Sequence, residues 1–267
     1  MESFKKYSKV IFAVVLATMI RIIVAQFSGP DPVSLQFSQS FLVKQLGIGA
    51  VAGPAILIVY FFLAVLFIKL EWIVSGNAFV KALKFSIFGL IAFWGFVECF
   101  PLFDSPVYVT LSYGIIEGLM YLLLFVLLAL IMKVKKTSYP RFSIEPLIII
   151  IIAAVFTAGR YISYYVGIES GYKTSIAYTF FWTLIMGIII GTMYNVLFKP
   201  GYSYSVRNAV IFSVIVFGTF WMTFNLFGPL LFDTNWLPFI PRVTLDILYV
   251  MAGVIVAEKL LARRKIQ

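Results

Sequence analysis

Eight long apolar segments, joined by short polar loops, take up almost the whole sequence. The hydrocarbon core of a bilayer is about 30 Å thick, so a helix that crosses it needs about 20 apolar residues. Soluble domains are about 45–50% apolar and about 25% charged, whereas this chain is 62% hydrophobic and 12% charged. The sequence therefore predicts an all-α integral membrane protein with eight transmembrane helices. The predicted spans are residues 8–27, 46–68, 85–103, 108–132, 146–167, 175–198, 209–232 and 243–262.

The distribution of basic residues predicts the orientation of these spans. With the N-terminus in the cytoplasm, sixteen lysines and arginines lie at the inner ends of the spans, and only Lys44, Lys173 and Arg242 lie in outer loops. Cytoplasmic loops carry such an excess in membrane proteins. We therefore expect a multi-pass protein of the cell membrane with both termini cytoplasmic. This topology explains the net charge of +10 by contact with the lipid bilayer, without a nucleic-acid partner.

The composition removes several classes of function. The chain has no histidine and a single cysteine, Cys99, so haem ligation by histidine and typical zinc and copper sites are disfavoured. Disulfides within the chain and iron–sulfur clusters are excluded. The sequence carries no phosphate-binding loop and no nucleophile elbow. We therefore expect no metal and no cofactor. An enzyme is the less favoured class, since only acid–base chemistry on a lipid by carboxylates and tyrosines would remain.

An internal duplication is visible in the third and seventh spans. The segment FSIFGLIAFWGFVECF at 85–100 aligns without gaps with FSVIVFGTFWMTFNLF at 212–227. A Thr-x-x-Arg motif of the first span recurs in the fifth. An even number of spans in each repeat makes the two halves parallel, and the interface between them is then a natural place for a site. The sequence predicts two parallel four-helix repeats, residues 1–137 and 138–267.

Five ionisable residues lie inside the predicted spans: Arg21, Glu98, Glu117, Arg160 and Asp246. Each costs about 2.5–3.5 kcal/mol on insertion scales, so each needs a partner or a function. When each helix is followed from its oriented end, all five fall in the outer half of the bilayer. We therefore expect one or two charge clusters there.

Helical spacing adds polar and aromatic neighbours to these charges, because residues three or four apart share a face. The neighbours are expected to line an intramembrane polar pocket on the outer side. The candidate ligand-binding or charge-cluster residues are Arg21, Glu98, Glu117, Arg160, Asp246, Asn225, Tyr113, Tyr164, Trp94 and Trp221.

Two structural interpretations compete with a binding site. The charges could be buried ion pairs that hold the helices together, because breaking such a pair is costly even where no ligand binds. Tyrosines and tryptophans near the outer ends could likewise form an interfacial aromatic belt.

Three functions remain open. In a transporter or permease-like subunit, the two arginines would bind an anionic solute and the carboxylates would balance charge or carry protons. Its difficulty is the inner half, where only Asn195 and Thr192 are candidates. The protein could instead be a quinol-binding anchor of an electron-transfer complex, with quinone as ligand, redox subunits as partners and Glu98 or Glu117 as proton acceptor. A structural subunit of a larger membrane assembly is the third hypothesis.

Overall fold

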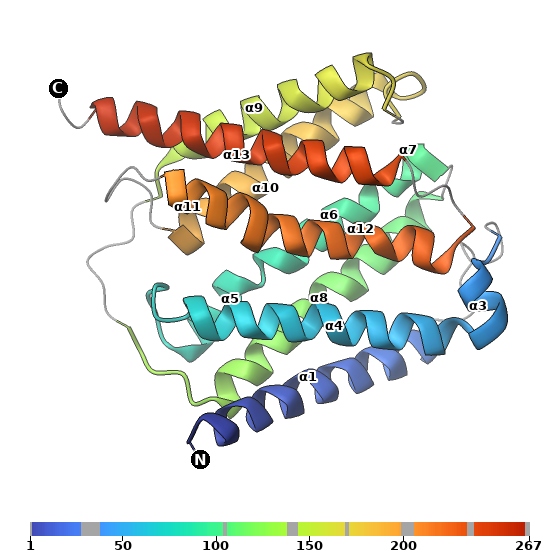
Figure 1. Ribbon diagram of the computed structural model, residues 1–267, viewed down its shortest axis with the longest axis vertical. Coiled ribbons are helices and arrows are strands. Elements are labelled where there is room, and N and C mark those ends of the chain that lie inside the picture. The colour runs from blue at the N-terminus through green and yellow to red at the C-terminus, as the bar shows by residue number, and fades with distance from the viewer. Residues whose placement is uncertain are drawn as a thin grey trace.

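The computed structural model describes residues 2–27, 38–103, 106–137, 144–168, 171–198, 206–233 and 238–264. Within these residues it contains eight helices that are long and apolar enough to cross a membrane, which confirms the predicted all-α membrane class. The helices run side by side, and both termini lie at the same end of the bundle (Figure 1). We call this the termini end and the other the opposite end.

Six of the eight spans are continuous α-helices, whereas the third and the seventh are assembled from shorter segments. The continuous spans are α1 (Glu2–Phe27), α4 (Ile48–Leu70), α8 (Val107–Ile131), α9 (Pro146–Tyr165), α10 (Ile176–Phe198) and α13 (Phe239–Arg264). The third span consists of α5 (Ala78–Phe85), α6 (Ile87–Val97) and α7 (Cys99–Phe103). The seventh consists of α11 (Val206–Val210), the π-helical η1 (Ile211–Gly218) and α12 (Thr219–Leu231), and a short helix α3 (Phe41–Leu46) precedes α4.

The third span begins seven residues earlier than predicted, at Ala78 rather than at residue 85. Asn77 starts it, because its side-chain oxygen accepts a hydrogen bond from the backbone N–H of Val80 at 2.9 Å and satisfies a free amide of the first turn. Lys81 lies in this extension of the helix, and its charge is compensated by an ion pair with Glu71. A local cap and a local charge partner therefore extend this helix.

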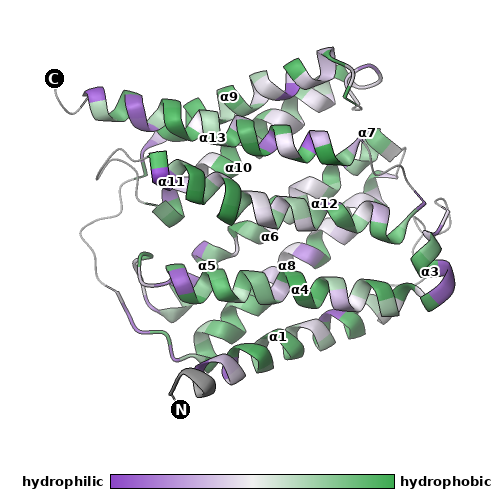
Figure 2. Ribbon diagram, viewed as in Figure 1, coloured by the Kyte–Doolittle hydropathy of each residue, from purple (hydrophilic) through white to green (hydrophobic). Residues whose placement is uncertain are grey.

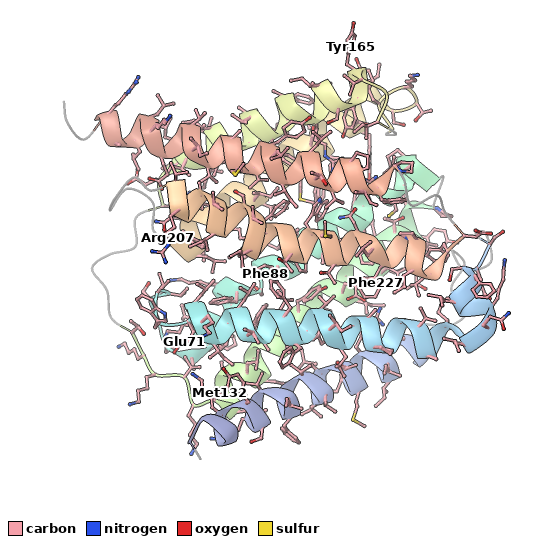
Figure 3. All side chains as sticks on the ribbon, viewed as in Figure 1. Glu71, Phe88, Met132, Tyr165, Arg207 and Phe227 are labelled. Atoms are coloured by element: carbon pink, nitrogen blue, oxygen red, sulfur yellow. The ribbon has the colours of Figure 1, made fainter. Side chains whose placement is uncertain are left out.

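Helix packing groups the spans into two sets. In the first set α1 contacts α4 and α8, and α6 contacts α8; in the second α9 contacts α10 and α13, and η1 contacts α13. The sets meet where α4 contacts α12 and α6 contacts α10, and we call this contact the seam. Phe88 lies in the middle of the molecule (Figure 3), with its ring 5.2 Å from that of Phe220 and 6.1 Å from that of Phe125. Aromatic packing thus fills the centre of the seam.

The outer surface of the bundle is apolar, as expected of helices in lipid. Large hydrophobic side chains such as Leu130, Ile150 and Ile162 are all more than 60% exposed. Figure 2 shows hydrophobic residues along most of each helix, with hydrophilic residues at the ends and at isolated positions along α8 and α13. Helices suit this environment because they satisfy their own backbone polar groups.

Glycines bring α10 into backbone contact with α9. A Cβ atom on Gly187 would lie 2.6 Å from the Cα of Ala153, and one on Gly191 would lie 2.8 Å from the Cα of Ile149. Small residues at such spacing allow two membrane helices to approach closely. The pair α9–α10 is therefore a tightly packed unit, and it carries Arg160.

We expect Gly187→Ala to lower the stability of the protein, because the new methyl group meets backbone that cannot move aside; overpacking of this kind costs about 1–3 kcal/mol. The matched control is Gly53→Ala on α4, where nothing lies within 4 Å of the added Cβ. The check is the midpoint of thermal unfolding of both variants in detergent. Equal midpoints would contradict the close α9–α10 contact.

Candidate functional site

Arg160 lies at the centre of a buried charge cluster near the opposite end. Its Nη1 donates to Oε1 of Glu98 at 2.7 Å, and its Nη2 donates to Oδ2 of Asp246 at 2.6 Å. Its Nε lies 2.6 Å from Oδ1 of Asp246. Arg160 and Asp246 have no exposed surface, and Glu98 is 7% exposed. We call Glu98, Arg160 and Asp246 the triad; it joins α9 and α13 of the second set to the third span of the first set.

Aromatic side chains enclose the triad. The Trp182 ring lies 4.8 Å and the Phe156 ring 5.6 Å from the guanidinium carbon of Arg160. The indole N–H of Trp221 donates to Oδ2 of Asp246 at 2.9 Å. Such surroundings exclude water, and charge–charge interactions inside them are stronger than in solution.

A break in the third span positions Glu98. The N–H of Glu98 donates to the carbonyl of Gly95 at 3.2 Å rather than to that of Trp94. The indole N–H of Trp182 donates to the carbonyl of Trp94 instead, at 2.8 Å. Pro101 has no N–H to offer the carbonyl of Val97, and the hydroxyl of Tyr178 donates to it instead. Side chains of α10 therefore satisfy the carbonyl groups that the break leaves free.

A second arginine belongs to the same network. Arg242 is 8% exposed, and its Nη2 donates to Oδ1 of Asn225 at 2.9 Å. Asn225 donates in turn to the carbonyl of Trp221 at 2.9 Å. Arg242 precedes Asp246 by one helical turn. Even so, no carboxylate of the described residues forms an ion pair with Arg242. Its Nε also has no hydrogen-bond partner among the described residues. Its guanidinium lies 4.8 Å from the ring of Phe239.

Sequence reasoning placed Arg242 in an outer loop, and this was wrong. The helix α13 begins at Phe239, because Pro241 is compatible with a first helical turn, and Arg242 lies inside the span. The signal that could have found it is its spacing of four residues from Asp246, which places both on one helix face.

A separate pair occupies the first set of helices. Arg21 of α1 donates through Nε to Oε1 of Glu117 on α8 at 2.6 Å, and both residues are about 8% exposed. Tyr60 and Tyr121 lie within electrostatic range of this pair, with ring centroids 5.5 Å apart. The hydroxyl of Tyr60 has no hydrogen-bond partner among the described residues. The five expected charges therefore form two clusters.

The other candidates lie beside these clusters. Trp94 donates to the carbonyl of Trp182 at 2.9 Å, which together with the bond from Trp182 joins α6 to α10 twice. Tyr164 is buried one turn beyond Arg160, and its ring stacks on Tyr172 at 6.1 Å. Tyr113 is half-buried, one turn before Glu117.

The inner-half candidates are satisfied locally. The amide of Asn195 donates to the carbonyl of Gly191 at 3.2 Å and accepts from the N–H of Glu145 at 3.0 Å. The hydroxyl of Thr192 donates to Ile188 of its own helix at 2.8 Å. Sequence reasoning missed Glu258 and Tyr194, which form a buried hydrogen bond on this side at 2.7 Å.

Comparisons with known proteins add no assignment: no family model matches the chain, and no curated protein or solved structure matches it either.

We expect Arg160→Gln to destabilise the protein far more than Glu98→Gln. Removing the arginine leaves two buried carboxylates facing each other, and breaking a buried pair costs about 3–5 kcal/mol. Glu98→Gln instead leaves Arg160 paired with Asp246. The measurement is folded yield and unfolding midpoint in detergent; equal values for the two variants would show that Arg160 does not hold the triad together.

For the first cluster we expect Arg21→Leu alone to lower stability sharply, because it leaves the charge of Glu117 buried without a partner. The double variant with Glu117→Leu is expected to recover much of the loss, since replacing both members of a buried pair by apolar residues is often neutral. A double-mutant cycle of unfolding midpoints tests this, and additive effects of the two changes would contradict it.

Proposed function

We propose that the protein is a membrane transporter that moves a small anionic solute together with a proton. Arg242 binds the anion, and the two carboxylates of the triad take up the proton. The observation that carries the proposal is the state of Arg242: it is buried, it pairs with no carboxylate of the described residues, and it lies one helical turn before Asp246, which shares Arg160 with Glu98.

Charge balance explains why the two events are coupled. With both carboxylates ionised, Glu98 and Asp246 together balance Arg160 and Arg242, so the network is neutral. An anion on Arg242 cancels the charge of that arginine and leaves one negative charge in excess among the other three residues. A net charge inside a membrane protein is costly, and a proton on Glu98 or Asp246 removes it. Anion and proton therefore favour each other's binding, and by linkage the effect is reciprocal.

The choice of arginine follows from what each one already binds. Arg160 is held by two carboxylates and Arg21 by one, so an anionic solute would have to displace protein groups from them. Among the described residues, the side chain that hydrogen-bonds to Arg242 is the neutral amide of Asn225. Arg242 also lies close to the start of α13, at the end of the bundle away from the two termini, which is where we expect a solute to enter.

The irregular spans support a transport role. The third and seventh spans are the interrupted ones among the eight, and they are also the two that resemble each other in sequence. Interrupted helices at matching places of two halves are typical of transporter binding sites, and π-helical segments occur often at functional sites. Ser86, at the first break of the third span, aligns with Ser213 inside η1.

We infer that the two sets of helices are parallel repeats. A two-fold axis along the membrane normal would map the contact of α4 with α12 onto that of α10 with α6, and both contacts occur. It would also map the pair of α1 and α8 onto the pair of α9 and α13, each of which carries an arginine–carboxylate ion pair. The basic residues at the termini end support a cytoplasmic location for that end in the cell membrane.

The test uses purified protein in liposomes that contain a pH-sensitive dye. Radiolabelled succinate, glutamate, phosphate and sulfate serve as anion probes. We expect one of them to enter with protons in the wild type. Arg242→Gln should lose anion binding, because the ligand cation is gone. Glu98→Gln should bind the anion but lose the accompanying proton uptake, because the neutral amide already removes one negative charge and the bound anion then leaves no excess charge for a proton to cancel.

Lys173→Gln is the matched control, since it removes an exposed basic residue at the same end and should transport like the wild type. Equal anion binding by Arg242→Gln and wild type would contradict the role of Arg242. Copurified quinone or redox subunits, with no binding of any probe, would replace transport by the quinol-anchor function.

A further inference from the structure

Glu258 is a buried carboxyl group on the termini side of the membrane that the anion site does not use. It is 3% exposed and lies near the end of α13. The hydroxyl of Tyr194 donates to its Oε1 at 2.7 Å, while its Oε2 is buried and has no hydrogen-bond partner among the described residues. Half of this carboxyl group is therefore unsatisfied.

Within the described residues, no basic side chain forms an ion pair with Glu258. Tyr194 is itself 1% exposed, and its ring packs on Phe198 at 5.7 Å and on Phe212 at 4.9 Å. Among the described residues, the charged groups on or next to the elements that pack around this end of α13 are Glu145 before α9, Arg207 of α11, and Lys259 and Arg263 of α13 itself. None of them forms an ion pair with Glu258 within the described chain. An ionised Glu258 would thus be an isolated charge in apolar surroundings, which is several kcal/mol unfavourable.

We propose that Glu258 and Tyr194 form a second proton-binding site, in which Glu258 holds a proton and passes it to the termini side. A protonated carboxyl keeps one oxygen as acceptor for Tyr194 and turns the other into a donor. Its role in transport rests on the proposed function; its protonation rests on the geometry alone.

The position of Glu258 suits a proton path along α13. Residues 246 and 258 are twelve apart, which is about 18 Å along a helix, so α13 carries one buried carboxyl group toward each of its ends. Ser213 of η1 lies along this path. Its carbonyl faces Gly218, which is next to Ile247 of α13, and the preceding residue, Phe212, packs on Tyr194. The buried hydroxyl of Ser213 has no hydrogen-bond partner among the described residues.

The first test is chemical labelling of the full-length protein in liposomes with dicyclohexylcarbodiimide. This apolar reagent reacts with protonated carboxyl groups inside membranes. Peptide mass spectrometry compares Glu258 with Glu117, which is similarly buried but ion-paired with Arg21. We expect labelling of Glu258 to exceed that of Glu117 and to vanish in Glu258→Gln. Equal labelling of the two residues, or none at Glu258, would overturn the proposal.

The second test is the proton-flux assay. Glu258→Gln should keep anion binding and lose proton uptake, and Glu258→Asp should restore part of the uptake because it keeps a carboxyl group. Full proton uptake by Glu258→Gln would overturn the inner site and leave the anion–proton function standing. If the wild type moves no protons with any probe, the proposed function fails, and the labelling still decides whether Glu258 holds a proton.

Discussion

The sharing of one guanidinium by two carboxylates is the interaction on which the rest of this bundle depends. Arg160 binds Asp246 within its own set of helices and Glu98 across the seam. Both carboxylates are buried, and without Arg160 they would face each other with no cation between them. The triad therefore fixes three helices at one level of the membrane. The same sharing makes the cluster sensitive to any further charge that arrives nearby, which is the property a coupled transporter needs.

Rigid and irregular parts of the structure have separate roles. The glycines of α10 allow direct backbone contact with α9, so Arg160 is presented by a stiff pair of helices. Glu98 and Trp221 come instead from the third and seventh spans, where breaks and a π-helical segment interrupt regular hydrogen bonding. The protein thus combines a cation on a tightly packed helix pair with Glu98 and Trp221, which come from the two irregular spans.

The membrane class, the number of spans and the grouping of charges could be predicted from sequence, because lipid imposes length and hydropathy directly on each helix. Arg21, Glu98, Glu117, Arg160 and Asp246 were found because a charge in an apolar run is conspicuous. Their pairing could not be found, since it depends on how helices rotate about their axes. Arg242 and Glu258 were missed because they lie near the ends of a span, where sequence alone does not separate a buried charge from one in water.

The two tryptophans of the seam have a consequence for how this contact tolerates sequence change. Trp94 and Trp182 each donate to the backbone carbonyl of the other residue. Because every residue type supplies a backbone carbonyl, replacing one tryptophan removes one bond and leaves the acceptor of the other in place. The α6–α10 contact therefore keeps one of these two hydrogen bonds when either tryptophan is replaced, but replacing Trp182 also leaves the carbonyl of Trp94 free and removes the ring beside Arg160. The ion pair between Glu98 and Arg160 differs, because both partners are side chains and replacing either one removes the interaction.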